Sequence, residues 1–165
     1  FFLPLLYIIT IFKIMNKLIK ELLFSHCESS LKCRLISYKK RSDELYESLK
    51  SETKSSAGDK HETGRAMIQI DREKTGKQIK EVEKEYELLS KINSITVLNS
   101  AGLGSVVITK ENQYYIAISA EPFEYNSKIY YCISRKSPIG SLLFGKKTGN
   151  IVVFNDRKIE VLEVL

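Results

Sequence analysis

Hydrophobic positions in the first half of the chain recur at alternating steps of four and three residues. One such series comprises Leu31, Leu35, Tyr38, Ser42, Leu45 and Leu49, and a second comprises Ile68, Arg72, Thr75, Ile79, Val82, Tyr86 and Leu89. A repeat of 3.5 residues keeps one face of a helix turned toward a partner helix, as in a coiled coil. The pattern therefore predicts two long helices that pack on each other.

A short polar segment separates the two series. Residues 51–59 read SETKSSAGD and contain small and charged side chains only. Because a turn this short sends the second helix back along the first, residues 15–93 are expected to form an antiparallel hairpin, with its tip near 55–62 and arms of roughly 50 Å. Polar residues within the two series, and the glycines Gly64 and Gly76, weaken the packing between the two helices. A hairpin that only dimerises or stiffens the molecule fits the same pattern.

The second half of the chain has the pattern of short strands. Runs rich in β-branched and aromatic residues lie at 95–98, 105–109, 114–119, 129–133, 151–154 and 159–165, with turn-forming residues between them. Residues 137–145 differ, because a serine, a proline and a final glycine in this order are typical of a short capped helix. The chain is therefore predicted to be an α+β protein in which residues 94–165 form a small antiparallel sheet with one short helix.

The chain begins with an apolar segment. Residues 1–12 contain no charged side chain, and the first methionine is Met15. Twelve helical residues span about 18 Å, less than the roughly 30 Å hydrocarbon core of a bilayer, and no basic residues precede them as in a secretory signal. We interpret residues 1–14 as sequence upstream of a start at Met15. A weak membrane or export segment is the alternative.

Composition narrows the class of protein. Of the 165 residues, 43% are hydrophobic and 28% charged, which is typical of a globular protein. The net charge of +6 is spread over both parts, with 18 basic and 14 acidic residues in 1–93 and 8 and 6 in 94–165. Sequence-specific DNA reading is therefore not indicated. Three cysteines, Cys27, Cys33 and Cys132, are not expected to form a disulfide framework, and Cys132 is expected to be a buried strand residue. With a start at Met15, the protein is expected to be cytoplasmic and its cysteines reduced.

Five tyrosines in the second half allow two interpretations. They could stack on the bases of single-stranded nucleic acid, or alternation along the strands could send many of them into the core. The residues are Tyr114, Tyr115, Tyr125, Tyr130 and Tyr131. We favour burial in the core, because the alternation of side chains along a strand is enough to place many of these tyrosines there.

Two local strings give the sequence a family resemblance. Residues 137–147, SPIGSLLFGKK, look like the C-terminal signature of the Gre-type transcript cleavage factors of bacterial RNA polymerase. Residues 58–62, GDKHE, are similar to the hairpin tip of that family, where a glutamate follows the aspartate by three residues. The family's layout, a helical hairpin followed by a small sheet domain, also corresponds to residues 15–165.

The resemblance implies a function exerted on RNA polymerase. The C-terminal domain would have an FKBP-like fold and bind the polymerase through Ser137, Pro138, Ile139, Gly140, Gly145 and Lys146. The hairpin tip would enter the secondary channel, where Asp59 and Glu62 would help to hold a catalytic Mg²⁺ for cleavage of backtracked RNA. The chain would not be an enzyme by itself: it would supply carboxylates in trans, bind no cofactor when free, and meet nascent RNA and DNA only indirectly. It would be a monomer with no small-molecule substrate and no membrane partner.

The acidic pair also has a purely structural interpretation. An aspartate before a helix with a glutamate three residues later forms a capping box, and negative charge is favourable at a helix N-terminus. The tip departs from the Gre pattern after Glu62, where Thr63, Gly64, Arg65 and Ala66 follow. Nearby cations compete with Mg²⁺ for the carboxylates. A Gre-like regulator that does not cleave RNA, and a non-enzymatic hairpin that binds another helix, are therefore the alternatives.

Overall fold

The computed structural model describes residues 5–54, 59–92 and 99–165 and shows two long helices, a six-stranded sheet and one short helix. The helices are α1 (Leu5–Lys54) and α2 (Asp59–Leu89). The chain divides into two compact units, one made of Phe1–Ser30 with Leu88–Leu165 and the other of Leu31–Glu87. The protein is thus of the α+β class, as the sequence predicted.

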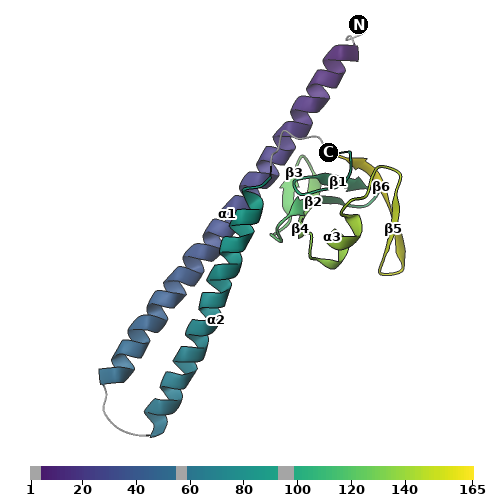
Figure 1. The fold of residues 1–165 in the computed structure, drawn as a ribbon. Helices are drawn as coiled ribbons and strands as arrows, with labels where there is room; N and C mark the ends of the chain where they lie inside the picture. The colour runs from purple at the N-terminus through teal and green to yellow at the C-terminus, as the bar shows by residue number, and fades with distance from the viewer. Residues whose placement is uncertain (1–4, 55–58, 93–98) are drawn as a thin grey trace. The chain divides into compact units, whose positions relative to one another are not determined.

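The unit 31–87 is a pair of antiparallel helices, called here the shaft (Figure 1). Every residue of the two predicted stripes is buried or half-buried, and Leu31, Leu45, Thr75 and Val82 are the most buried of them in this unit. Residues off the stripe, such as Ile36 and Met67, are largely exposed. The 3.5-residue repeat therefore identified the packed face of both helices, including its polar positions.

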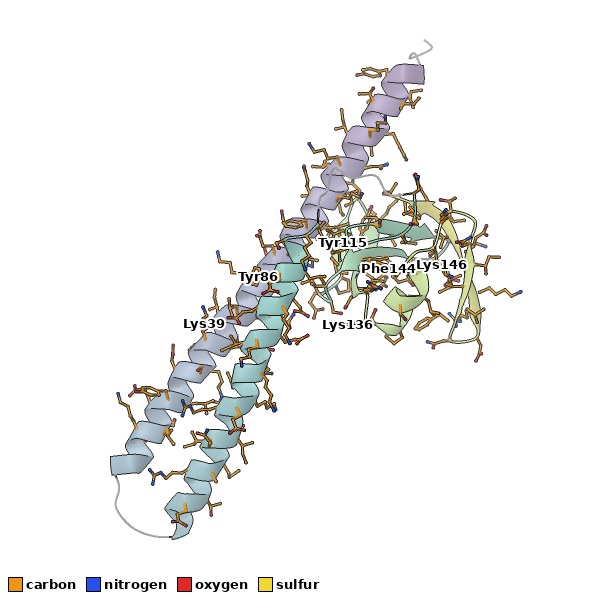
Figure 2. The ribbon with its side chains drawn as sticks, in the orientation of Figure 1. Lys39, Tyr86, Tyr115, Lys136, Phe144 and Lys146 are labelled. Carbon is orange, nitrogen blue, oxygen red and sulfur yellow. The ribbon has the colours of Figure 1, made fainter. Side chains whose placement is uncertain are left out.

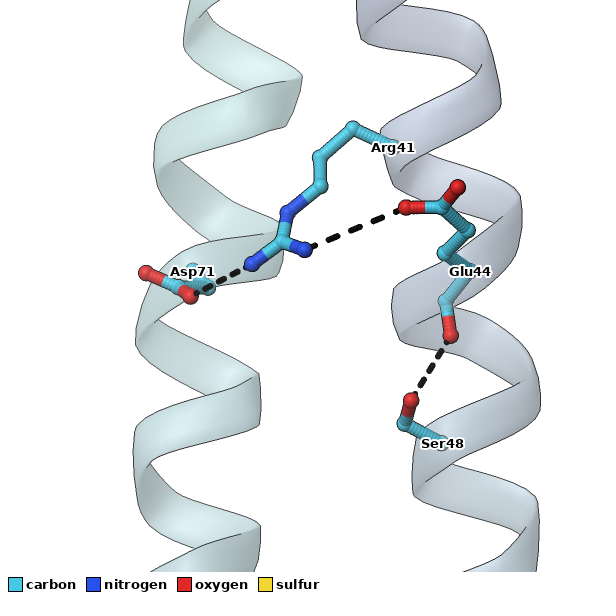
Figure 3. Close-up of polar contacts among 4 residues, drawn as sticks. All are labelled: Arg41, Glu44, Ser48 and Asp71. Atoms are coloured by element: carbon cyan, nitrogen blue, oxygen red, sulfur yellow. Dashed lines mark hydrogen bonds and ion pairs between the residues drawn. The ribbon is translucent and has the colours of Figure 1, made fainter.

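Among the described residues, two ion pairs join the helices of the shaft. Arg34 Nη1 lies 2.5 Å from Glu85 Oε2, and both side chains are partly buried. Arg41 Nη2 lies 3.3 Å from Asp71 Oδ2, and the same guanidinium lies 3.9 Å from Glu44 (Figure 3). These pairs fix which residues of α1 and α2 face each other, although exposed pairs of this kind add only about 0–1 kcal/mol each.

Residues 99–165, called here the sheet module, contain all six described strands. The strands are β1 (Val106–Thr109), β2 (Gln113–Ala117), β3 (Phe123–Tyr125), β4 (Lys128–Ser134), β5 (Ile151–Phe154) and β6 (Arg157–Val164). Their order in the sheet is β3-β4-β2-β1-β6-β5. Five of the six predicted runs correspond to strands, and the sixth, 95–98, lies outside the described residues.

The sheet differs from the prediction in two respects. Strands β2 and β4 pair in parallel, from Gln113 with Tyr130 to Ala117 with Ser134, whereas an entirely antiparallel sheet was expected. The cause is β3, a three-residue edge strand that the sequence analysis missed. After β2 the chain first forms β3, which lies at the edge of the sheet. It then reverses direction, so β4 lies between β3 and β2 and runs parallel to β2.

Two tight turns close the outer hairpins of the sheet. Asn126 and Ser127 connect β3 to β4, and Asn155 and Asp156 connect β5 to β6; all four have positive φ between 50° and 61°. Two consecutive left-handed residues form the type I′ turn, whose twist matches that of paired strands. Asparagine and aspartate tolerate this conformation well. The turn at Asn155 and Asp156 was expected from the sequence, whereas the one at Asn126 and Ser127 was not.

The core of the sheet module lies beneath the short helix α3 (Pro138–Leu143). It is formed by side chains from several strands and one helix, namely Ala101, Val107, Tyr114, Ile116, Leu143, Val152 and Val161. The five tyrosines of the second half are buried or half-buried, which confirms the core interpretation. Burial of each large apolar side chain contributes about 1.5–3 kcal/mol, so this cluster dominates the stability of the module.

The first part of α1 belongs to the same compact unit as the sheet module. Ile19, Leu23 and Cys27, spaced four residues apart on one helical face, are almost completely buried. His26 Nε2 lies 2.8 Å from the carbonyl oxygen of Glu121, and its ring lies 5.1 Å from that of Phe123. The helix continues through Met15 without a break. Among the described residues, no helix combines the length and apolar character needed to cross a bilayer.

Candidate functional site

The predicted polymerase-binding string, residues 137–147, folds as a capped helix and the turn that follows it. Ser137 has extended backbone angles (φ −69°, ψ 154°), and its Oγ accepts a hydrogen bond of 3.1 Å from the backbone N–H of Gly140. The same hydroxyl donates to the carbonyl of Ser134 at 2.7 Å. Pro138 occupies the first helical turn, where its missing N–H costs no hydrogen bond. Serine and proline thus start α3 at a fixed position.

Gly140 is required by a close backbone approach. A Cβ atom at this position would collide with the carbonyl oxygen of Ser134 and would lie 2.8 Å from Ser137 Oγ. Both atoms belong to the cap that starts α3, so they have little freedom to move. The glycine of the string therefore serves the tight packing of α3 against the end of β4.

The end of the string is fixed to the start of the sheet module. Gly145 has φ of +79°, which favours glycine, and its N–H donates to the carbonyl of Ala101 at 2.6 Å. The N–H of Ala101 donates in return to the carbonyl of Lys146 at 2.7 Å. Figure 2 labels Phe144 and Lys146 at this end of α3. The six predicted binding residues therefore lie together in one hydrogen-bonded stretch, in which Gly140 is buried and Ile139 packs against the core.

A group of cations flanks α3, and the sequence analysis did not recognise it. Arg135 and Lys136 precede the helix and Lys146 and Lys147 follow it; these four are called here the basic collar. The guanidinium carbon of Arg135 lies 4.1 Å from the ring centre of Phe144, which brings the two ends of the collar together. Averaging charge over the whole second half concealed this cluster, because residues 125–155 contain five basic and no acidic side chains.

The predicted metal-binding carboxylates lie in the first turn of α2. The helix starts at Asp59, so Asp59 is its first residue rather than the residue before it, and Glu62 is exposed one turn later. The side chain of Asp59 and residues 55–58 lie outside the described part of the chain. Negative charge in this turn interacts favourably with the positive end of the helix dipole, whatever its further role.

Exposed apolar side chains lie one and two turns beyond Glu62. Met67 and Ile70 are 66% and 65% exposed, and both lie off the packed stripe. In the described residues, no group of three or more histidine, cysteine, aspartate or glutamate side chains is arranged to hold a metal ion. The described tip end of the shaft therefore offers an exposed carboxylate, Glu62, and an exposed apolar surface.

A separate groove of about 650 Å³ lies between the β1–β2 turn and the β5–β6 hairpin. Its walls include Lys110, Asn112, Tyr114 and Arg157, and none of the predicted site residues lines it. Tyr114 is held there by a 3.2 Å hydrogen bond from the Asn112 amide. Burial raises the pKa of the Tyr114 hydroxyl, which therefore remains neutral at physiological pH.

Comparison with known proteins gives a likeness among solved structures. No protein-family model matches the chain, and no curated protein matches it. Among solved structures, the chain is similar to the transcription factor Gfh1, with 22% sequence identity and a TM-score of 0.34. That match covers 84% of this chain and 92% of the other. A TM-score at this level does not establish a shared fold.

Proposed function

We propose that this chain is a Gre-type accessory factor of bacterial RNA polymerase. The sheet module docks on the polymerase through residues 137–147 with an FKBP-like domain, and the shaft carries its tip into the secondary channel. There Asp59 and Glu62 assist cleavage of backtracked RNA. The chain itself is not an enzyme, because the polymerase supplies the catalytic magnesium and most of the active site.

The shaft is the observation that carries this proposal. Its 31-residue α2 is about 46 Å long, yet only one stripe of each helix is buried. A helix pair that buries so little surface per residue gains less stability than a compact bundle of the same length. A long, narrow helix pair of this kind can place a side chain at its tip far from the domain that anchors the protein.

The first turn of α2 fits the chemical part of the proposal. Glu62 is exposed and in the same turn as Asp59, and a magnesium ion accepts one or two carboxylates beside water and phosphate oxygens. A two-metal hydrolysis needs the second ion placed opposite the first, with a water aligned for in-line attack. Two carboxylates brought by the tip would complete such a site only inside the polymerase.

The basic collar supports docking by the sheet module. Lys136 and Lys147 are exposed at opposite ends of α3, and exposed Pro138 and Ser141 lie between them. The basic collar thus surrounds a small, partly apolar surface and is suited to bind an acidic surface of a partner protein. Complementary charges speed the encounter of two proteins and fix their relative orientation. The string that resembles the Gre signature thus lies among the basic residues of the collar.

RNA cleavage in a stalled elongation complex tests the proposal. Protein covering residues 15–165, added with Mg²⁺ to the matching bacterial polymerase, is expected to accelerate release of short 3′ fragments at least tenfold. The double variant Asp59→Ala/Glu62→Ala should lose the acceleration but still compete with a known secondary-channel factor. Glu83→Ala, an exposed glutamate of the same helix far from the tip, is the matched control and should behave as wild type.

Docking is tested separately by charge reversal. Lys136→Glu/Lys147→Glu should weaken polymerase binding at least tenfold, whereas Lys128→Glu, an exposed lysine on the β3–β4 hairpin, should have little effect. Binding is measured by displacement of a labelled secondary-channel factor at two salt concentrations. Equal effects of the two variants would contradict a docking surface at α3.

The departures from the Gre tip favour a second candidate. Thr63, Arg65 and Ala66, all exposed, stand where the family carries other residues, and Lys60 and His61 separate the two carboxylates. In this second candidate the tip occupies the channel without cleaving RNA. Competition with a channel factor, together with unchanged cleavage rates, would distinguish this regulator from a cleavage factor. No competition and no cleavage would contradict both.

A further inference from the structure

The groove between the β1–β2 turn and the β5–β6 hairpin takes no part in the proposed function. Its volume of about 650 Å³ lies in the usual range of small-molecule sites. One wall is the turn of residues 109–112, and the other is the hairpin at one edge of the sheet, drawn in yellow in Figure 1. Both walls belong to the sheet module, so the groove lies within a single compact unit.

Hydrogen bonds fix both walls of the groove. Thr109 Oγ1 donates to the carbonyl of Asn112 at 2.8 Å and accepts from its N–H at 3.1 Å, and the Thr109 N–H donates to the same carbonyl at 2.9 Å. On the other side, Asn155 and Asp156 form the tight turn described above, and β5 pairs with β6 along all four of its residues. The groove is therefore largely formed before any ligand binds, which favours affinity.

Three positive side chains from the two walls line the groove. Lys110 lies in the β1–β2 turn, whereas Arg157 and Lys158 are the first residues of β6. All three are exposed, and none of them forms an ion pair or a side-chain hydrogen bond with another described residue. Their charges are therefore available to an anion, and a phosphate group can accept several charge-assisted hydrogen bonds at once.

A buried hydrogen-bond donor accompanies the cations. Tyr114 is 9% exposed, and its hydroxyl accepts a hydrogen bond of 3.2 Å from the Asn112 side-chain amide. Because burial raises the pKa of this hydroxyl, it keeps its proton at physiological pH. A hydroxyl can donate as well as accept, and this proton has no acceptor among the described residues. Tyr114 can therefore donate to an oxygen atom of a ligand in the groove.

The remaining residues of the groove suit a planar ring that carries hydrogen-bond donors. Half-buried Phe154 and Ile159, together with exposed Ile151, provide apolar surface on which a ring can pack. Two carboxylates, Glu111 and Glu160, also line the groove, so three positive and two negative groups leave a formal charge of +1. Ionised carboxylates only accept hydrogen bonds. They therefore match N–H and O–H groups of a ligand and disfavour a ligand that is only a polyanion.

We propose that this groove binds a nucleoside monophosphate, a ligand that combines one phosphate group, a planar ring system and several N–H and O–H groups. Lys110, Arg157 and Tyr114 bind the phosphate oxygens. Phe154 packs against the base, and the carboxylates accept hydrogen bonds from the base or the ribose. The molecule is held as a ligand and is not converted. This inference does not depend on the proposed action on RNA polymerase, because no residue of the groove belongs to the shaft or to the basic collar.

Nuclear magnetic resonance titration of the isotope-labelled full chain with adenosine monophosphate tests the proposal. The backbone amide signals of residues 109–114 and 151–160 are expected to shift together, with one dissociation constant below about 1 mM. Inorganic phosphate and adenosine, which each carry only part of the ligand, should bind at least about tenfold more weakly. Benzoate, a ring with a carboxylate, should also bind more weakly, because it offers fewer acceptor oxygens and no donors.

Variants of the groove show which side chains hold the ligand. Arg157→Ala should weaken binding of adenosine monophosphate at least about tenfold, and Tyr114→Phe, which removes only the hydroxyl, should weaken it severalfold. Lys128→Ala, at an exposed position outside the groove, is the matched control and should bind as wild type. Absence of shifts at millimolar ligand in the wild-type chain, or equal affinity for inorganic phosphate, would overturn the proposal. Unchanged binding by folded Arg157→Ala would overturn it as well.

Discussion

The shaft and the sheet module bury their residues in different ways. In the shaft, a single stripe of each helix is covered, and apolar residues such as Ile36, Met67 and Ile70 are exposed. In the sheet module, Val107, Ile116, Leu143 and Val161 are fully buried, and hydrogen bonds fix both ends of α3. Stability therefore resides mainly in the module. The shaft gains length at the expense of buried surface.

The largest loss of stability is expected from a cavity in the core of the sheet module. Leu143→Ala removes a fully buried side chain beneath α3 and should cost about 2–5 kcal/mol of unfolding free energy. Leu142→Ala, at the half-buried neighbouring position, is the control and should cost clearly less. Chemical denaturation followed by circular dichroism measures both. Equal small losses would show that the core beneath α3 is not the source of stability.

Glycine substitutions test both regions with opposite expected signs. A Cβ at Gly104, where φ is +84°, would lie 2.6 Å from Ile92 Cγ2, so Gly104→Ala should destabilise the protein by about 1–3 kcal/mol. A Cβ at Gly76 of α2 meets nothing within 4 Å, so Gly76→Ala should stabilise the shaft by about 0.5–1 kcal/mol. Thermal unfolding measures the two shifts. Destabilisation by Gly76→Ala would contradict the open helix surface at that position.

The buried Tyr115 hydroxyl provides a pH-dependent test of the module. Burial raises the pKa of Tyr115 above its ordinary value of 10.0, so the unfolded chain releases this proton at lower pH than the folded chain. Stability should therefore fall as pH rises above about 10, and Tyr115→Phe should reduce that fall. The variant should also gain about 1 kcal/mol at neutral pH, because it removes an unpaired buried hydroxyl. Denaturation curves at pH 7 and pH 10.5 show both effects, and an unchanged pH dependence would contradict the buried environment.

The smallest effects are expected at the ion pairs of the shaft. Breaking the partly buried pair with Glu85→Gln should cost about 1 kcal/mol, since its partner Arg34 loses a charged hydrogen bond. Asp71→Asn, which disrupts the exposed pair with Arg41, should cost less than about 0.5 kcal/mol and nothing measurable at high salt. A double-mutant cycle for each pair measures the coupling. A larger coupling energy for the exposed Arg41–Asp71 pair than for the Arg34–Glu85 pair would contradict this expectation.

The sequence predicted the elements whose local pattern is strong. The two stripes were identified completely because a 3.5-residue repeat over several turns constrains the packed face, even at Thr75 and Arg72. The short helix at 138–143 was predicted from its serine cap and proline, which act within a few residues. Strand β3 was missed because three residues after a proline, with Glu124 in the middle, carry too little pattern.

Features that depend on distant contacts were not predictable in the same way. The parallel pairing of β2 with β4 depends on where β3 returns to the sheet, which no local pattern records. At the candidate site, the string at 137–147 was identified from its own residues. The basic collar was overlooked because charge was averaged over the whole second half, and the contact of Arg135 with Phe144 then shows that its two ends meet. The arrangement of Asp59 with Glu62 remains a prediction.

Site-specific photo-cross-linking from the tip shows whether it enters the secondary channel of RNA polymerase. A photoreactive residue at exposed Arg65, one turn from Glu62, is introduced into otherwise unchanged protein and irradiated with the matching RNA polymerase. The account predicts cross-links to polymerase residues that line the secondary channel, and their loss when a known channel factor is added in excess. Folded protein that gives no cross-link to the polymerase, or cross-links only outside that channel, would contradict the account.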